Sequence, residues 1–392
     1  MSCIYLDEAA TTKPKKEVIE AMLPYFTEMW ENPSALYKPA VDIKKKIEEA
    51  RETVAKFIGA KRNEIFFTSS GSESNCWAIQ GFVKECEIEG KYPIIITSVI
   101  EHKSILDCVE DTTALFIDVD DKGFVNVDEL EEILKKISTY NKLNNIEDKV
   151  LVSIQFANNE IGTVQHIKKI ADLVHRYNGV FHTDAVQAFG HLPIDVEKFN
   201  IDLLSASGHK ISTPKGIGFL YKKTGIDIKP IIYGSQMDGM RGGTENVPYI
   251  IGMAKAIEIC GLDLYKIKIM NEIRDVVVNL FKSEFNCKLN GDSSNRLPNN
   301  INITFPQNVT GEALLYMLDM SNIYISTGSA CNSHSIKPSY VLKSIGLSNE
   351  EAMKTIRITL PDIDNYTVEE YEELIDKFID EIRKAVKLIE ME

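Results

Sequence analysis

Residues 180–187 read VFHTDAVQ, an apolar run that polar residues follow directly. The apolar part is typical of a buried parallel strand. Residues 93–99 and 150–156 have the same character, and polar stretches with His or Asn follow them. Between such runs lie helical patterns, as in residues 42–58. This alternation predicts an α/β fold with a mostly parallel sheet and a ligand site at the carboxyl ends of its strands.

The pattern changes after about residue 261. Residues 265–285 predict a long helix, residues 299–305 a strand and residues 311–319 another helix. A last amphipathic helix places one set of apolar residues on a single face: Tyr371, Leu374, Phe378, Ile382 and Val386. We therefore predict a large domain over residues 15–262 and a smaller α+β domain that includes residues 263–392. The polar stretch 135–149 is expected to be a surface excursion.

The composition restricts the functional classes. Among 392 residues, 44 Lys and Arg stand against 58 Asp and Glu, a net charge of −14 that argues against general binding to nucleic acid or anionic membrane. The apolar runs are too short to span a bilayer, and the acidic start of the chain is unlike a signal peptide. We expect a cytoplasmic enzyme. Seven cysteines without a C-x-x-C pair predict neither a disulfide framework nor a structural metal site.

Lys210 lies in residues 205–221, SASGHKISTPKGIGFLY. A solvated loop lysine is the common explanation for such a residue. Here, however, Ser207 and His209 precede it and could bind a phosphate. A lysine that forms a Schiff base needs desolvation or nearby positive charge to lower its pKa. The segment therefore indicates a candidate carbonyl-binding lysine.

Two further segments supply matching groups. In residues 182–187, Asp184 is either an ordinary turn residue or the carboxylate that keeps the ring nitrogen of pyridoxal phosphate protonated. Gln187 could donate to the phenolic oxygen of the same ring. In residues 68–75, TSSGSESN, the start of a helix is either a plain N-cap or an anion site built from backbone N–H groups. No P-loop or dinucleotide motif accompanies them.

These segments belong to a longer series of motifs that resembles the cysteine desulfurases of the NifS/IscS type, which are class-V pyridoxal-phosphate enzymes. The resemblance runs nearly end to end. It implies the fold of aspartate aminotransferase, fold type I of the pyridoxal-phosphate-dependent transferases, with residues 1–14 joining the small domain. The other motifs are IYLDEAATT (4–12), NPS (32–34), EHK (101–103), NNEIGTVQ (158–165), PKGIG (214–218), GMRGGTENV (239–247) and TGSAC (327–331).

The resemblance implies a role for each site residue. Lys210 holds the cofactor and removes the Cα proton of the substrate, Asp184 pairs with the pyridinium, and Gln187 with the phenolic oxygen. His102 stacks on the ring and takes part in proton transfer, although a lone histidine is more often structural. The implied phosphate ligands are Gly71, Ser72, Ser207, His209 and, from a neighbouring subunit, Thr244.

The same resemblance implies L-cysteine as substrate. Asn159 would lie beside the cofactor and help to orient the substrate. Arg357 would bind the substrate carboxylate with two hydrogen bonds, a geometry that lysine does not supply; a surface ion pair is the alternative for Arg357. Cys331 lies in a Gly/Ser-rich stretch, where an exposed cysteine is an oxidation risk unless it has a function. The Cys331 thiolate would attack the substrate sulfur, leaving a persulfide on Cys331 and releasing alanine.

The chain departs from the family pattern at residues 35–40, at residues 234–238, at Ser72 and at Thr359 and Pro361. These positions concern the edge of the substrate pocket and the dimer contact more than the cofactor. Another pyridoxal-phosphate reaction, such as transamination or selenocysteine cleavage, and a non-catalytic binding protein remain the alternatives. The partners expected are a second copy of the chain and a sulfur acceptor such as an iron–sulfur scaffold or a tRNA-thiolation protein, with no direct nucleic acid and no membrane.

Overall fold

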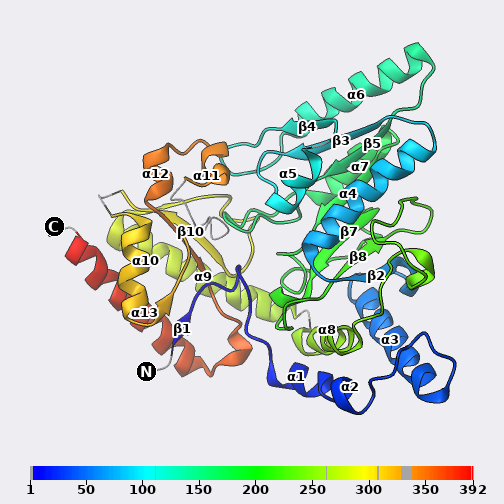
Figure 1. Ribbon diagram of the computed structural model, residues 1–392. Coiled ribbons are helices and arrows are strands. Elements are labelled where there is room, and N and C mark those ends of the chain that lie inside the picture. Colours follow the sequence, from blue (N-terminus) through cyan, green and yellow to red (C-terminus); the bar gives the residue numbers. More distant parts are fainter. Residues whose placement is uncertain are drawn as a thin grey trace.

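The computed structural model describes residues 3–110, 112–261, 263–306, 309–327, 338–389 and 391. Its main sheet lies in one lobe and a smaller sheet in the other (Figure 1). The main sheet has seven strands in the order β2 (Ile65–Thr68), β8 (Gly218–Lys222), β7 (Leu203–Ser207), β6 (Val180–Asp184), β5 (Lys149–Ser153), β3 (Pro93–Ser98) and β4 (Ala114–Ile117).

The main sheet is mostly parallel, which confirms the predicted α/β class. Strands β7, β6, β5, β3 and β4 pair in parallel, and only β8 runs antiparallel, between β7 and β2. Because β8 is antiparallel to both of its neighbours, β2 and β7 point the same way. The carboxyl ends of β2, β3, β5, β6 and β7 therefore meet at one edge of the sheet.

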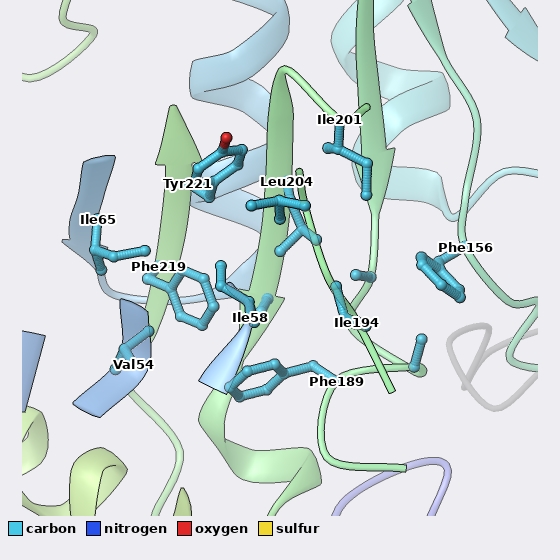
Figure 2. Packing of buried hydrophobic residues seen from close by; sticks show 14 of the residues in the cluster. Val54, Ile58, Ile65, Phe156, Phe189, Ile194, Ile201, Leu204, Phe219 and Tyr221 are labelled. Carbon is cyan, nitrogen blue, oxygen red and sulfur yellow. The ribbon is translucent and has the colours of Figure 1, made fainter. Parts of the chain in front are cut away.

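Helices cover both faces of this sheet because successive strand residues alternate between two cores. On β7, Leu204 faces the larger core and Leu203 the other core. Figure 2 shows Leu204 and Phe219 on neighbouring strands, with Phe189 nearby. The rings of Phe189 and Phe219 pack edge to face with centroids 5.1 Å apart.

The helices of the main lobe are α1 (Lys16–Met22), α2 (Pro24–Thr27), α3 (Lys38–Phe57), α4 (Gly71–Ile88), α5 (Lys103–Val109), α6 (Val127–Asn144), α7 (Ile167–Arg176) and α8 (Val247–Cys260). Short 3-10 turns are η1 (Arg62–Glu64), η2 (Gly208–Lys210) and η3 (Met237–Gly239). Helix α6 covers much of the polar stretch 135–149, which was expected to be a surface excursion. Its one-sided apolar residues, Leu130 and Leu134, are buried in its first half, and it ends at Asn145 in the left-handed conformation.

The second lobe contains a three-stranded sheet in the order β12 (Thr355–Thr359), β10 (Asn300–Thr304) and β9 (Lys288–Leu289). Near it, β1 (Ile4–Tyr5) pairs in parallel with β11 (Ile323–Tyr324), so the first residues of the chain lie against its C-terminal part. The helices here are α9 (Leu264–Phe285), α10 (Gly311–Met320), α11 (Tyr340–Ser344), α12 (Asn349–Met353), η4 (Ile363–Asn365) and α13 (Val368–Ile389).

Helix α13 buries the apolar face that its sequence predicts, including Phe378 and Ile382, against the core of the second lobe. The division of the chain at residues 15–262 stays a prediction. Within the described residues, no helix has the length and apolar character needed to cross a membrane.

Candidate active site

A cavity of about 390 Å³ lies at the edge where the parallel strands end. Turns after β2, β3, β5, β6 and β7 line it, as predicted for an open α/β sheet. Ten of the predicted site residues line it: Gly71, Ser72, His102, Asn159, Asp184, Gln187, Ser207, His209, Lys210 and Arg357.

The other two predicted site residues are Thr244 and Cys331. Thr244 is exposed on the loop before α8 and does not line the cavity of its own chain. Cys331 falls outside the described residues.

The amino end of α4 forms one wall of the cavity. Ser70 caps the helix by accepting a hydrogen bond from the backbone of Glu73. Gly71 is required next, because a Cβ atom there would come within 2.5 Å of a methyl group of Val186. With no side chain at Gly71, the first N–H groups of a helix of 18 residues stay open toward the cavity, and such a helix end binds anions.

A chain of hydrogen bonds connects Asp184 to His102. Asn75 on α4 donates to Oδ2 of Asp184 (2.7 Å), and the same amide nitrogen contacts Oγ of Ser104 on α5 (2.9 Å). Ser104 in turn contacts Nδ1 of His102 through its hydroxyl (2.8 Å) and its backbone N–H (3.1 Å). Because Nδ1 accepts the backbone hydrogen, a neutral His102 carries its proton on Nε2. The backbone N–H of Val186 completes the support of Asp184 at 2.9 Å.

His182 supports this edge from within the sheet. It is fully buried, and its two ring nitrogens contact the hydroxyls of Ser153 (2.8 Å) and Ser205 (3.0 Å) on the neighbouring strands. Burial lowers the pKa of His182 to about 3, so the ring is neutral at pH 7. Its role is to join β5, β6 and β7 just before Asp184.

Lys210 leaves η2 directly after β7 and is 8% exposed. Its Nζ donates to the backbone carbonyls of Ala9 (2.5 Å) and Ala10 (2.8 Å). Gln187 donates to the same Ala9 carbonyl at 3.1 Å. The N-terminal arm, the segment that contains Ala9 and Ala10, thus holds the amine of Lys210 inside the cavity and orients Gln187 beside it.

His209 precedes Lys210, and its Nδ1 lies 3.2 Å from the hydroxyl of Thr11. Burial, together with the positive charges of Lys210 and Lys215, lowers the pKa of His209 to about 4. His209 is therefore neutral at pH 7. It can act toward a phosphate as a hydrogen-bond donor.

Arg357 enters the cavity from β12 in the second lobe. It is 2% exposed, so the alternative of a surface ion pair is wrong. Its guanidinium donates to Oδ1 of Asp7 (2.7 Å) and to the backbone carbonyl of Asn159 (3.1 Å). Nε of Arg357 is buried and has no hydrogen-bond partner among the residues that the structure describes. A buried donor in this state favours an additional acceptor such as a carboxylate.

Two buried glutamates lie beside His102. Glu101 accepts hydrogen bonds from Ser98 (2.6 Å) and from the backbone of Gln155, and burial raises its pKa to about 8. Glu160 lines the cavity and accepts a hydrogen bond from Ser339 at 2.5 Å. Burial raises the pKa of Glu160 to about 7, although Ser339 and the charge of Arg357 act against this rise.

Sequence reasoning assigned no role to Asn75, Ser104 or Glu160. A signal for Asn75 was present, since it follows Gly71 by one helical turn and therefore shares its face. Glu160 directly follows Asn159 in a quoted motif. Nothing in the sequence places Ser104 or Asp7, because their contacts join segments far apart in the chain.

The comparisons with known proteins agree with this geometry. Residues 4–370 match the family described as aminotransferase class V. A cysteine desulfurase IscS of Dictyoglomus turgidum is 44% identical over 388 residues, which cover 95% of each chain. A cysteine desulfurase IscS of Methanosarcina thermophila is 43% identical over 364 residues, covering 91% of this chain and 87% of the relative.

Solved structures show the same fold. A NifS-like protein superposes with a TM-score of 0.85 at 33% identity, covering 98% of this chain and all of the other. A protein named SspA, solved in complex with cysteine, superposes with a TM-score of 0.78 at 36% identity, covering 92% of this chain and 99% of the other.

Proposed function

The chain belongs to the class-V aminotransferase family and is a cysteine desulfurase that depends on pyridoxal phosphate, and we propose that the cavity around Lys210 is where it takes sulfur from L-cysteine. The observation that carries this proposal is the convergence of Lys210, Asp184, His102 and Arg357 on one cavity. The first three come from the main lobe, whereas Arg357 comes from the second lobe.

The residues present fit pyridoxal phosphate. The open amino end of α4 suits its phosphate, and the gap left by Gly71 would be closed by any side chain. Asp184 suits the protonated ring nitrogen, and the buried Oδ1 of Asn75 beside it lacks a hydrogen-bond partner in the described part of the chain. When bound, the cofactor supplies an electron sink that makes the Cα–H bond of the substrate acidic.

The residues of the chain act on the proton and the carboxylate of the substrate. The Lys210 amine, held by the N-terminal arm, is placed to take the Cα proton. Asn75 and Val186 fix the Asp184 carboxylate in one orientation. Arg357 lines the cavity and binds the substrate carboxylate through its guanidinium. The Nε2–H of His102 is a donor that can pass a proton within the cavity.

We assign the sulfur-accepting step to Cys331. Its thiolate attacks the substrate Sγ, a new S–S bond forms, and the Cβ–Sγ bond breaks. The products are a persulfide on Cys331 and, after proton uptake at Cβ and return of a proton to Cα, alanine. Cys331 lies outside the described residues, so this role rests on the resemblance of the TGSAC segment.

The partners are proposals as well. A second copy of the chain would bring Thr244 to the phosphate, since Thr244 is exposed and away from the cavity of its own chain. Exposed apolar side chains on and near α1 and α2, namely Leu23, Phe26 and Trp30, are compatible with such a contact. We propose that the persulfide passes to an iron–sulfur scaffold or a tRNA-thiolation protein in the cytoplasm.

Two substitutions test the proposal. Lys210→Ala should lose the visible absorbance that borohydride abolishes in the wild type, because no lysine remains to hold the cofactor covalently. Cys331→Ala should keep that absorbance and lose both alanine and sulfide release from cysteine. Keto-acid-dependent transamination by the wild type, or cysteine turnover at the wild-type rate by Cys331→Ala, would contradict the proposal. Cys3→Ala, which changes an exposed thiol, is the matched control.

A further inference from the structure

Helices α4 and α5 bring Cys76 and Cys108 together behind the cavity. Cys76 follows Asn75 directly, and Cys108 lies one turn after Ser104. The Asn75–Ser104 contact (2.9 Å) joins the two helices. Further along both helices, Gln80 on α4 joins them again by donating to the backbone carbonyl of Cys108 on α5 (2.8 Å). Between these contacts lie the two thiols, near enough for each to shift the pKa of the other, and both residues are partly exposed.

The two thiols differ in acidity. The hydrogen bond from Cys108 lowers the pKa of Cys76, and Lys84 adds to this effect, whereas burial and Glu73 oppose it. The same hydrogen bond raises the pKa of Cys108, as do burial and Asp107. Cys76 is therefore the more acidic thiol of the pair.

The other buried cysteines that the structure describes have a different environment. Burial raises the pKa of Cys86 to about 11 and that of Cys287 to about 12. A buried thiol of high pKa is inert toward disulfides. Reactivity toward oxidants at α4 is thus expected at Cys76 and not at Cys86.

We propose that Cys76 and Cys108 form a reversible disulfide when the enzyme meets a low-molecular-weight disulfide. The Cys76 thiolate attacks one sulfur of the oxidant, which forms a mixed disulfide and releases one thiolate. The charge that suppressed ionisation of Cys108 is then gone. Cys108 loses its proton, attacks the sulfur of Cys76 and releases the second thiolate. The pair gives up two electrons, and the oxidant is reduced to two thiols.

This disulfide would act on the site from behind. It would link α4 to α5 beside the Asn75–Ser104 contact, which is one step in the hydrogen-bond chain from Asp184 to His102. The spacing of the two helices, and with it the position of His102 over the cavity, would then depend on the redox state of the pair.

Peptide mapping tests the proposal on the full-length holoenzyme. The protein is incubated with oxidised glutathione at neutral pH, free thiols are alkylated, and non-reduced peptides are analysed by mass spectrometry. We expect a Cys76–Cys108 cross-link that dithiothreitol removes, absent from Cys76→Ser and Cys108→Ser and retained in Cys3→Ser. A stable glutathione adduct on Cys76 beside an alkylated Cys108, or no reaction at either residue, would overturn the proposal.

A second measurement, the alkylation rate of Cys76, tests the interaction of the two thiols without forming the disulfide. Alkylation of Cys76 by iodoacetamide at neutral pH should slow several-fold in Cys108→Ala, since the hydrogen bond that favours the thiolate is lost. An unchanged rate would mean that the two thiols do not interact in solution, and the proposal would fail.

Discussion

The two walls of the cavity are built differently. The wall from the main sheet places Asp184, His102 and Lys210 at strand ends and connects them through hydrogen bonds that cross several elements. The wall from the second lobe contributes Arg357 from β12 and Tyr340 from α11. On the proposed roles, the first wall offers what any pyridoxal-phosphate reaction needs, whereas the second provides Arg357 for the substrate carboxylate. We therefore expect cofactor chemistry and substrate binding to be separable by mutation.

The largest effect is expected on the sheet wall. Asp184→Asn removes the charge that holds the ring nitrogen protonated, and activity should fall about 1,000-fold, as when a preorganised electrostatic partner is lost. Steady-state alanine release and the absorbance of the bound cofactor measure the loss. Asp172→Asn on α7, an exposed carboxylate away from the cavity, should leave both unchanged. Activity within a few-fold of the wild type would remove Asp184 from its role.

Substitution on the second wall should separate binding from cofactor chemistry. Arg357→Lys keeps the charge but loses the planar pair of donors, so kcat/KM for cysteine should fall about 100-fold, mostly through KM. The cofactor absorbance should stay as in the wild type. Arg383→Lys on α13, whose arginine pairs with Glu284 at the surface, serves as control. A changed absorbance with an unchanged KM would show that the two walls are not separable.

The smallest effect concerns the contact between the walls, where Glu160 accepts a hydrogen bond from Ser339. The pKa of Glu160 in the folded protein is about 7, above the ordinary value of 4.5. Protonated Glu160 therefore contributes stability that is fully present below pH 4.5 and is lost as the pH rises through 7. Glu160→Gln cannot ionise. Relative to the wild type, its unfolding free energy should therefore be higher at pH 8 than at pH 5 by about 2 kcal/mol.

Urea denaturation of the holoenzyme at the two pH values measures this difference. Glu132→Gln on α6, where the carboxylate is largely exposed, should show no such dependence. If Glu160→Gln followed the wild type at both pH values, the Glu160 carboxyl would titrate normally.

Local sequence pattern was sufficient for much of the fold. The apolar runs placed β3 and β6 to within a residue at each end, and the one-sided pattern of residues 371–386 placed α13. Strand β8 was missed, because it begins at Gly218 in a glycine-containing segment and its antiparallel position depends on pairing with both β2 and β7. Residues 135–144 were too polar to be recognised as a helix that packs along one side only.

The site could be predicted where its residues follow strands. Asp184 and His102 lie at such positions, and their convergence follows from the direction of parallel strands. The partners that orient them could not be predicted, because Asn75 meets Asp184 across 109 positions and Arg357 meets Asp7 across 350. Contacts over such separations depend on how the lobes pack, which local propensity does not encode.

The pairing of β1 with β11 has a consequence for how the enzyme is made. The arm that carries Asp7 and Ala9 leaves the ribosome long before its partners Ile323 and Arg357 are synthesised. Closing a loop of this length is costly in chain entropy, and contacts of high sequence separation form slowly. We therefore expect the main sheet to fold during translation and the cavity to be completed only afterwards. Until then, the nascent chain would be unable to retain the cofactor.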